Sequence, residues 1–192
     1  MFRTARRLAP AIAALSLAAV PAGAAAHTSS FGSSLNHSPA NAGSTCEEDG
    51  LTGFTSCTHV GSYYPGFSGH AKSPNTGTIT KIKLRAQGPT TMTFKVVNVR
   101  HVAANHRSGQ AQATAKTRTV QVNGPTQDQA DDGIYPTETF NVHMKVRKGQ
   151  ELAVDTPSNT AEYCSDGTPG QLLFAPTLKL GKPFASSQGV DD

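Results

Sequence analysis

The chain has 192 residues, no Trp and a formal net charge of +4, from 17 Lys and Arg against 13 Asp and Glu. The first 26 residues carry three arginines and no acid, so the other 166 carry 14 basic against 13 acidic side chains, a net charge of +1. A chain with so little net charge gives no reason, on charge alone, to expect nucleic acid or an anionic membrane as its partner. A chain of that length can bury roughly two-thirds of its unfolded surface, enough for one domain.

Residues 1–26 have the pattern of a secretory signal peptide. Arginines precede an apolar, alanine-rich run over 8–20, and small residues offer cleavage after Ala24 or after Ala26. The run is too short and wrongly flanked for a membrane span. We favour the second site, which leaves His27 first. No cysteine follows to carry a lipid, and the C-terminus lacks an apolar span, so we expect a released, extracellular protein without a membrane anchor.

Residues 28–35 predict a first edge strand. Residues 36–74 are rich in Ser, Gly, Asn and Pro and have no sustained period, which predicts a long ordered loop with one short strand near 55–59. A loop of this length is unusual in a compact domain, and it indicates hidden short strands or a role for the loop.

Three cysteines indicate an oxidising compartment. A local disulfide between Cys46 and Cys57 is the economical pairing, and it would pin the loop and stabilise the fold by about 3 kcal/mol. Cys164 is then left over. It is either a buried free thiol or an alternative partner for one of the other two, and the sequence leaves both open.

Three further strands are predicted before residue 124. In 77–87 apolar and basic residues alternate, and Gly-Pro ends the run. In 91–102 the alternation changes parity at Val96 and Val97, which indicates a β-bulge or a strand buried on both faces. Residues 110–123 are rich in alanine, but their threonines favour a strand over a helix.

The strongest strand pattern covers 140–155. Apolar side chains take alternate positions from Phe140 to Met144 and on to Val146, with polar ones between them. A polar turn follows at 148–151, with a glycine free to take positive φ, and the alternation resumes at Leu152. The stretch predicts an antiparallel hairpin that buries one face against another sheet.

The rest of the chain completes an all-β pattern. Residues 124–133 predict a solvated loop, 160–164 a short strand, 171–180 the closing strand and 182–192 a disordered tail. About seven to nine short strands without a convincing helix predict an antiparallel two-sheet sandwich, jelly-roll-like, over 27–181.

One resemblance rests on the run from Met144 to Val154, which is similar to a penultimate hairpin of many jelly-roll modules. With Cys46, the Cys57-Thr58 segment and the strand start Gly77-Thr78-Ile79, the chain after the signal resembles uncharacterised secreted β-sandwich proteins of high-GC bacteria. The resemblance implies a fold and brings no activity and no functional residue with it.

A copper site is one alternative function. His27, as a new N-terminus, would offer an amine and a ring nitrogen to copper, as in secreted lytic polysaccharide monooxygenases and small periplasmic copper carriers. A second histidine would come from His101, His106 or His143. The aromatic-rich substrate face of a monooxygenase is missing, however. The competing interpretation is a frayed terminus and a solvent-facing His143, and we predict no metal and no cofactor.

No pattern supports catalysis. Glu47–Asp49 and Asp131–Asp132 lack the alternate spacing of a calcium loop and are interpreted as solvated acidic turns. Gly66–Gly69 is not a Gly-x-Ser-x-Gly elbow, and no His-Glu pair exists. Cys164 has no adjacent histidine and is interpreted as a small buried residue. No catalytic residue is therefore predicted.

Sugar binding is the other alternative. Tyr63 and Tyr64, with Phe67 close by, could stack on a sugar ring, although covering the loop's own small core is the competing interpretation. The sequence thus predicts a secreted, non-enzymatic binding module or structural exoprotein, with a glycan as one candidate ligand and no nucleic-acid partner. The alternatives are a copper protein using His27 and a weak carbohydrate-binding module using the two tyrosines.

Overall fold

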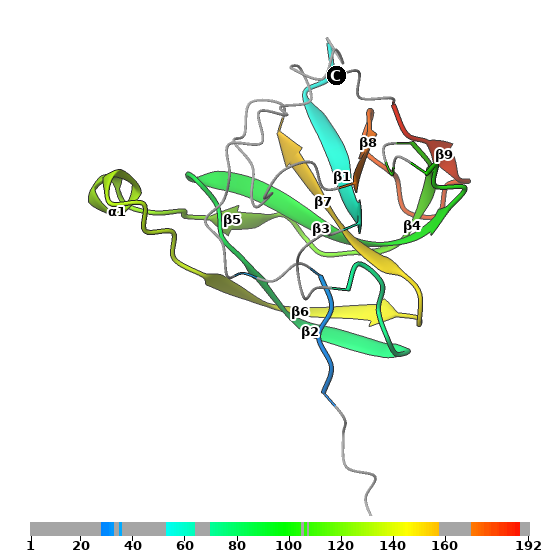
Figure 1. Cartoon of the computed structure of the whole chain (residues 1–192), viewed down its shortest axis with the longest axis horizontal. Helices are drawn as coiled ribbons and strands as arrows, with labels where there is room; N and C mark the ends of the chain where they lie inside the picture. The colour runs from blue at the N-terminus through cyan, green and yellow to red at the C-terminus, as the bar shows by residue number, and fades with distance from the viewer. Residues whose placement is uncertain are drawn as a thin grey trace, which may run out of the picture.

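The computed structural model describes residues 28–32, 35, 53–63, 70–104, 106, 108–157 and 170–188, which contain nine strands and one short helix (Figure 1). Their bounds are β1 Ser56–Tyr63, β2 Gly77–Leu84, β3 Thr90–Arg100, β4 Gln110–Lys116, β5 Val120–Val122, α1 Gln127–Asp131, β6 Glu138–Val146, β7 Glu151–Pro157, β8 Gly170–Phe174 and β9 Ala185–Ser186. All paired strands are antiparallel, which confirms the predicted all-β, antiparallel class. Within these residues no helix is long and apolar enough to cross a membrane.

The larger sheet has seven strands and curls. Six follow the order β8-β1-β7-β3-β4-β9, and β5 pairs with the start of β3. Beyond β9, the Gln188 N–H donates to the Leu173 carbonyl of β8 at 2.8 Å, so the last segment returns to the first strand of the series. This contact brings the sheet close to a closed barrel.

The smaller sheet consists of β2 and β6 and lies beneath the larger one in Figure 1. Its inner residues, such as Ile82 and Met144, pack against inner residues of β3 and β7, such as Phe94 and Val154. Phe140 and Leu152 are partly buried against the same cluster. Each large apolar side chain buried there contributes about 1.5–3 kcal/mol, so this cluster holds the two sheets together.

The predicted hairpin over 140–155 is wrong in its pairing. β6 pairs with β2, whereas β7 pairs with β1 and β3. The turn between them does contain a positive-φ glycine, Gly149 at 86°, but it carries the chain from one sheet to the other. Ser73 holds the turn, because its carbonyl accepts from the Gly149 N–H at 2.8 Å and its N–H donates to the Gln150 carbonyl at 2.7 Å.

Three other strand predictions are confirmed with shifted ends. The short strand near 55–59 is β1, which extends to Tyr63, and the strands over 77–87 and 91–102 are β2 and β3. The register of β3 against β4 shifts between Val96 and Val97. This shift confirms the irregularity that the parity change predicts.

The N-terminal and middle predictions need correction. Residues 28–32 form no strand and make only one bridge, from Gly32 to His70. The predicted strand 110–123 is two strands, because Thr117 leaves the ladder. The Thr117 N–H donates to the Phe94 carbonyl at 2.9 Å, and its hydroxyl accepts from the Phe94 N–H at 3.1 Å.

Helix α1 and strand β9 differ from the sequence-based prediction. α1 lies in the predicted loop 124–133 and begins with a capping box, in which the Thr126 hydroxyl accepts from the Gln129 N–H. β9 lies in the predicted tail 182–192 and pairs with β4. The predicted closing strand ends early, at Phe174. The predicted strand 160–164 lies outside the described residues.

Candidate functional site

Most of the positions that the sequence singles out lie outside the described residues. This holds for His27, Cys46, Tyr64, Cys164, Phe67, Gly66–Gly69 and Glu47–Asp49. For Tyr63 only the backbone, at the end of β1, is described. The copper, sugar-stacking and disulfide hypotheses that use these residues therefore stay predictions.

Cys57 is fully buried in β1 together with His59. Its Sγ lies 3.1 Å from His59 Nε2, and the two side chains are 0% and 1% exposed. Cys57 packs with Leu173 and Ala175 in a small apolar cluster. The cysteine thus has a packing role in the fold, and its pairing with Cys46 stays a prediction.

The other candidate ligands are spread over the molecule. His101 and His106 lie in the loop between β3 and β4, both with positive φ (54° and 59°), and His143 is exposed on β6. Asp131 and Asp132 lie at the C-terminal end of α1. Across the part of the chain that is described, no three His, Cys, Asp or Glu side chains are placed to hold one metal ion.

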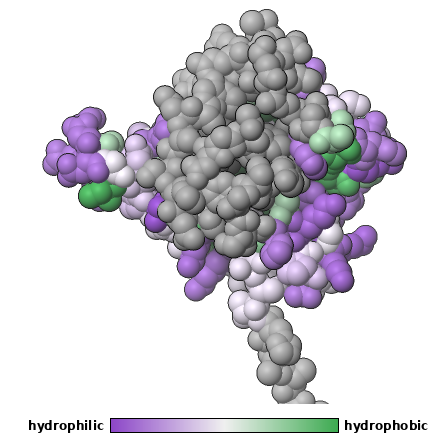
Figure 2. Space-filling model, in the orientation of Figure 1, coloured by the Kyte–Doolittle hydropathy of each residue, from purple (hydrophilic) through white to green (hydrophobic). Residues whose placement is uncertain are grey.

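A basic face covers the outer side of the smaller sheet. In the register of β2 and β6, Lys83 lies opposite Thr139 and Lys81 opposite Asn141, while the inward Ile82 lies opposite Phe140. The basic face consists of Lys81, Lys83, Arg85, His143, Lys145 and Arg147. Figure 2 shows hydrophilic side chains over the lower part of the molecule, where β2 and β6 lie in Figure 1.

None of the six described acidic residues is a member of this face, although Glu138 begins β6 opposite Leu84. Three lie in or directly after α1. Glu138 is held by the backbone N–H groups of Asn123 and Gly124, at 3.0 and 2.8 Å. Glu151 is buried, and Asp155 pairs with Lys95 inside the larger sheet. The described residues include 13 Lys and Arg side chains against six Asp and Glu side chains, and none of these six belongs to the basic face.

An open groove of about 630 Å³ borders the basic face along β6. One wall is residues 139–144 of β6, and the other is residues 116–118 and 120, where β4 ends and β5 begins. The second wall adds Lys116 and Arg118, both exposed. Among the described strands β6 pairs only with β2, so its other edge is left to the groove. Lys116 and Arg118 thus place positive charge on the side of the groove opposite the basic face.

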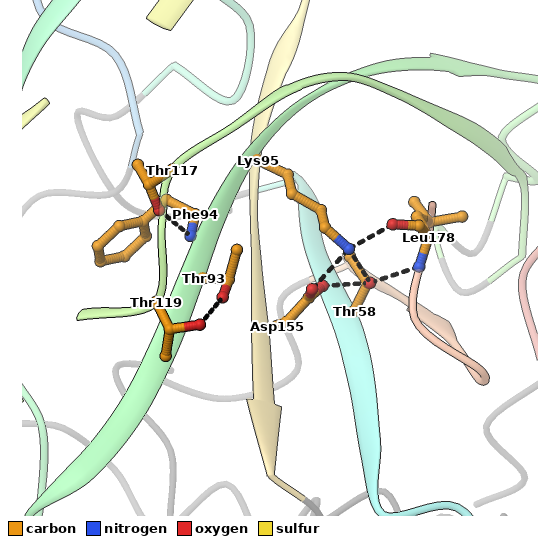
Figure 3. Close-up of polar contacts among 8 residues, drawn as sticks. All are labelled: Thr58, Thr93, Phe94, Lys95, Thr117, Thr119, Asp155 and Leu178. Carbon is orange, nitrogen blue, oxygen red and sulfur yellow. Dashed lines mark hydrogen bonds and ion pairs between the residues drawn. The ribbon is translucent and has the colours of Figure 1, made fainter. Parts of the chain in front are cut away.

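A polar cluster lies inside the curled sheet (Figure 3). Lys95 Nζ of β3 is 2.5 Å from Asp155 Oδ2 of β7, and their side chains are 4% and 18% exposed. Thr58 of β1 donates its hydroxyl to Asp155 Oδ1 at 2.5 Å, and the Leu178 carbonyl accepts from Lys95 Nζ. Burial lowers the pKa of Lys95, against the opposing effect of its hydrogen bond with Asp155.

Glu151 is a second buried ionisable group. Its side chain is 1% exposed, and Oε2 has no hydrogen-bond partner among the described residues. Burial raises the pKa of Glu151 to about 7, and the charge of Lys72, whose backbone bridges to Glu151, acts in the opposite direction. The protonated form is the one that such an environment favours.

Sequence reasoning missed both the basic face and the polar cluster. The lysines of 77–87 and 140–147 each show the right alternation, but only the pairing of β2 with β6 puts them on one surface. Lys95 and Asp155 are far apart in the sequence, and nothing local to either predicts their contact.

No protein-family model, no curated protein and no solved structure matches the chain. The resemblance to secreted β-sandwich proteins stays a prediction.

Proposed function

We propose that this chain is an exported, non-enzymatic binding protein whose basic face holds an acidic extracellular polysaccharide. The observation that carries the proposal is the clustering of charge: the basic side chains of β2 and β6 share one surface, and no described carboxylate is a member of it. A surface of one sign concentrates ions of the opposite sign and raises their rate of association.

The spacing of the cations favours a polymer over a small ligand. Alternate residues of a strand are about 7 Å apart, and neighbouring strands are about 5 Å apart, so Lys81, Lys83 and Lys145 belong to an open grid of charges. Small ligands are usually enclosed in a pocket. A chain of sugars that carries repeated carboxylate or sulfate groups can contact many points of such a grid at once, which multiplies weak contacts.

The same surface argues against single-stranded nucleic acid. Such ligands are held by aromatic side chains that stack on successive bases. The large exposed apolar side chains of the described residues are Phe54, Val102, Ile134 and Leu180, and none belongs to β2 or β6. The basic face can therefore bind a ligand through charge, but it offers no exposed Phe, Tyr or Trp ring on which bases could stack.

The remaining parts of the proposal come from the sequence. Export rests on the signal-peptide pattern over 1–26, and the extracellular location follows from it. The two-sheet, jelly-roll-like sandwich is supported by the core between the small and the large sheet, while the curl of the large sheet favours a more barrel-like description.

Titration calorimetry of the exported protein with polygalacturonate tests the proposal, with dextran as the neutral polymer and single-stranded DNA as the other polyanion. The double variant Lys81→Gln/Lys83→Gln should bind polygalacturonate about tenfold more weakly, if each charge contributes about 0.7 kcal/mol. Lys179→Gln/Lys182→Gln removes two exposed charges outside the basic face and should bind normally. Absent binding, equal losses in both variants, or tighter binding of DNA would overturn the proposal.

A further inference from the structure

The contact between Lys95 and Asp155 brings an amine and a carboxyl together in the interior of the larger sheet. The two residues lie on neighbouring strands, with Lys95 opposite Ala153 and Asp155 opposite Thr93, so their side chains meet diagonally across one strand pair. An apolar cluster of the same sheet includes Val60, Val97, Ala153, Leu172, Phe174 and Leu178. Of these residues, Ala153 lies opposite Lys95, and the Leu178 carbonyl accepts from Lys95 Nζ. Little water reaches Lys95 there, since only 4% of its side chain is exposed.

We propose that Lys95 and Asp155 form an intramolecular amide, an isopeptide bond between Nζ of Lys95 and Cγ of Asp155 that joins β3 to β7. The observation that carries this proposal is the 2.5 Å contact between Nζ and Oδ2 in a buried site where other groups hold both partners. The proposal does not depend on the function of the basic face.

The reaction balances without any co-reactant. A proton passes from the Lys95 ammonium to Oδ2 across their contact, which leaves a neutral amine and a carboxylic acid. The lone pair of Nζ attacks Cγ, and the N–C bond forms. The second amine proton passes to Oδ2, the bond from Cγ to Oδ2 breaks, and one water molecule leaves. No group is oxidised or reduced.

Thr58 is placed to assist this step. Its Oγ1 accepts from the Leu178 N–H at 2.9 Å and from Lys95 Nζ at 3.5 Å, both of which are donors, so its own proton points to Asp155 Oδ1. That hydrogen bond polarises the carbonyl and would stabilise the negative charge that develops on Oδ1 during attack. Leu178 also accepts from Nζ through its carbonyl and so fixes the amine.

The environment favours the uncharged pair that reacts. Separate ions are costly in an apolar interior, and burial lowers the pKa of Lys95, which favours the neutral amine. The amide product removes both charges from the interior. The Asp155 side chain is 18% exposed, so the site is in contact with solvent on the side of the carboxyl group.

Intact mass spectrometry of the purified exported protein, after reduction and alkylation of its cysteines, tests the proposal. The protein should be one water molecule lighter than its sequence, and a tryptic digest should contain a branched peptide joining the segments of Lys95 and Asp155, with no cleavage after Lys95. Lys95→Arg keeps the positive charge but has no reactive amine and should show the full mass. Asp155→Asn should lose ammonia in place of water and reach the same final mass as the unsubstituted protein.

The role of Thr58 has its own readout. Thr58→Val should slow the appearance of the lighter species in freshly refolded protein, and Thr58→Ser, which keeps the hydroxyl, should restore it. A full-mass protein that trypsin cleaves after Lys95 would overturn the proposal and leave a plain buried ion pair. Water loss mapped to another residue would overturn it equally.

Discussion

The ring of Phe94 packs against the ring of Phe140, with centroids 5.7 Å apart and planes inclined at 49°. Phe94 belongs to β3 of the larger sheet and Phe140 to β6 of the smaller one, so this pair joins the two layers. Tilted aromatic pairs contribute about 0.5–1.5 kcal/mol beyond their buried area. The contact therefore stabilises the packing of the smaller sheet, which carries the basic face, against the larger sheet.

Phe140→Ala should lower the free energy of unfolding by about 3 kcal/mol, because it removes a large side chain and the ring contact. Phe140→Leu keeps most of the buried volume and should cost about 1 kcal/mol. Urea unfolding followed by circular dichroism measures both. Equal and small effects of the two substitutions would show that the pair does not hold the sheets together.

Gly124 and Gly133 provide a matched test of backbone packing. Both have a φ of 69°, but a Cβ on Gly124 would lie 2.5 Å from the carbonyl carbon of Gly88, whereas a Cβ on Gly133 would meet nothing within 4 Å. Gly133→Ala should cost about 1 kcal/mol, the strain of a left-handed alanine. Gly124→Ala must also displace backbone and should cost about 3 kcal/mol.

Comparison of the two glycine variants by thermal unfolding separates conformational strain from steric overlap. A similar loss of stability in both would contradict the close approach of Gly124 to Gly88.

The buried Glu151 predicts that stability falls as the pH rises. The pKa of Glu151 in the folded protein is about 7, above the ordinary value of 4.5. Below pH 4.5 the carboxyl is therefore protonated in both the folded and the unfolded protein, and its burial costs no ionisation free energy. Between 4.5 and about 7 the unfolded chain ionises first, which favours unfolding. The penalty is complete above about pH 7 and amounts to roughly 3 kcal/mol.

Urea unfolding across this pH window tests the prediction. Glu151→Gln has no ionisable group at this position and should lose this part of the pH dependence, so the variant and the original protein should differ most above about pH 7. Identical pH profiles would mean that Glu151 ionises normally in the folded protein.

Local sequence signals predicted which side chains face inward, and they predicted the irregularity of β3 because the parity change at Val96 and Val97 is itself local. They failed at pairing. The alternation around Met144 reports a buried face, but it does not say that β6 pairs with β2 and leaves β7 to the other sheet. The capping box at Thr126 was legible in the sequence, and it marks a helix that the surrounding polar loop pattern concealed.

The functional features were less predictable for a related reason. The net charge of +1 after the signal peptide gives no reason to expect an anionic partner. A net charge does not say where the charged side chains lie, so it does not reveal a basic face. Lys83 and Lys145 share a surface only because their strands pair, and Lys95 meets Asp155 only because β3 lies beside β7. Both features depend on contacts between segments far apart in the chain.

The central claim is that the basic face is where the ligand binds, and amide chemical-shift mapping by NMR tests it most directly. On titration with short oligogalacturonates, the largest shifts should fall on β2, β6 and the groove residues 116–118 and 120, and added salt should diminish them. Shifts confined to the ends of β1 and β8, or no shifts at low salt, would contradict the account.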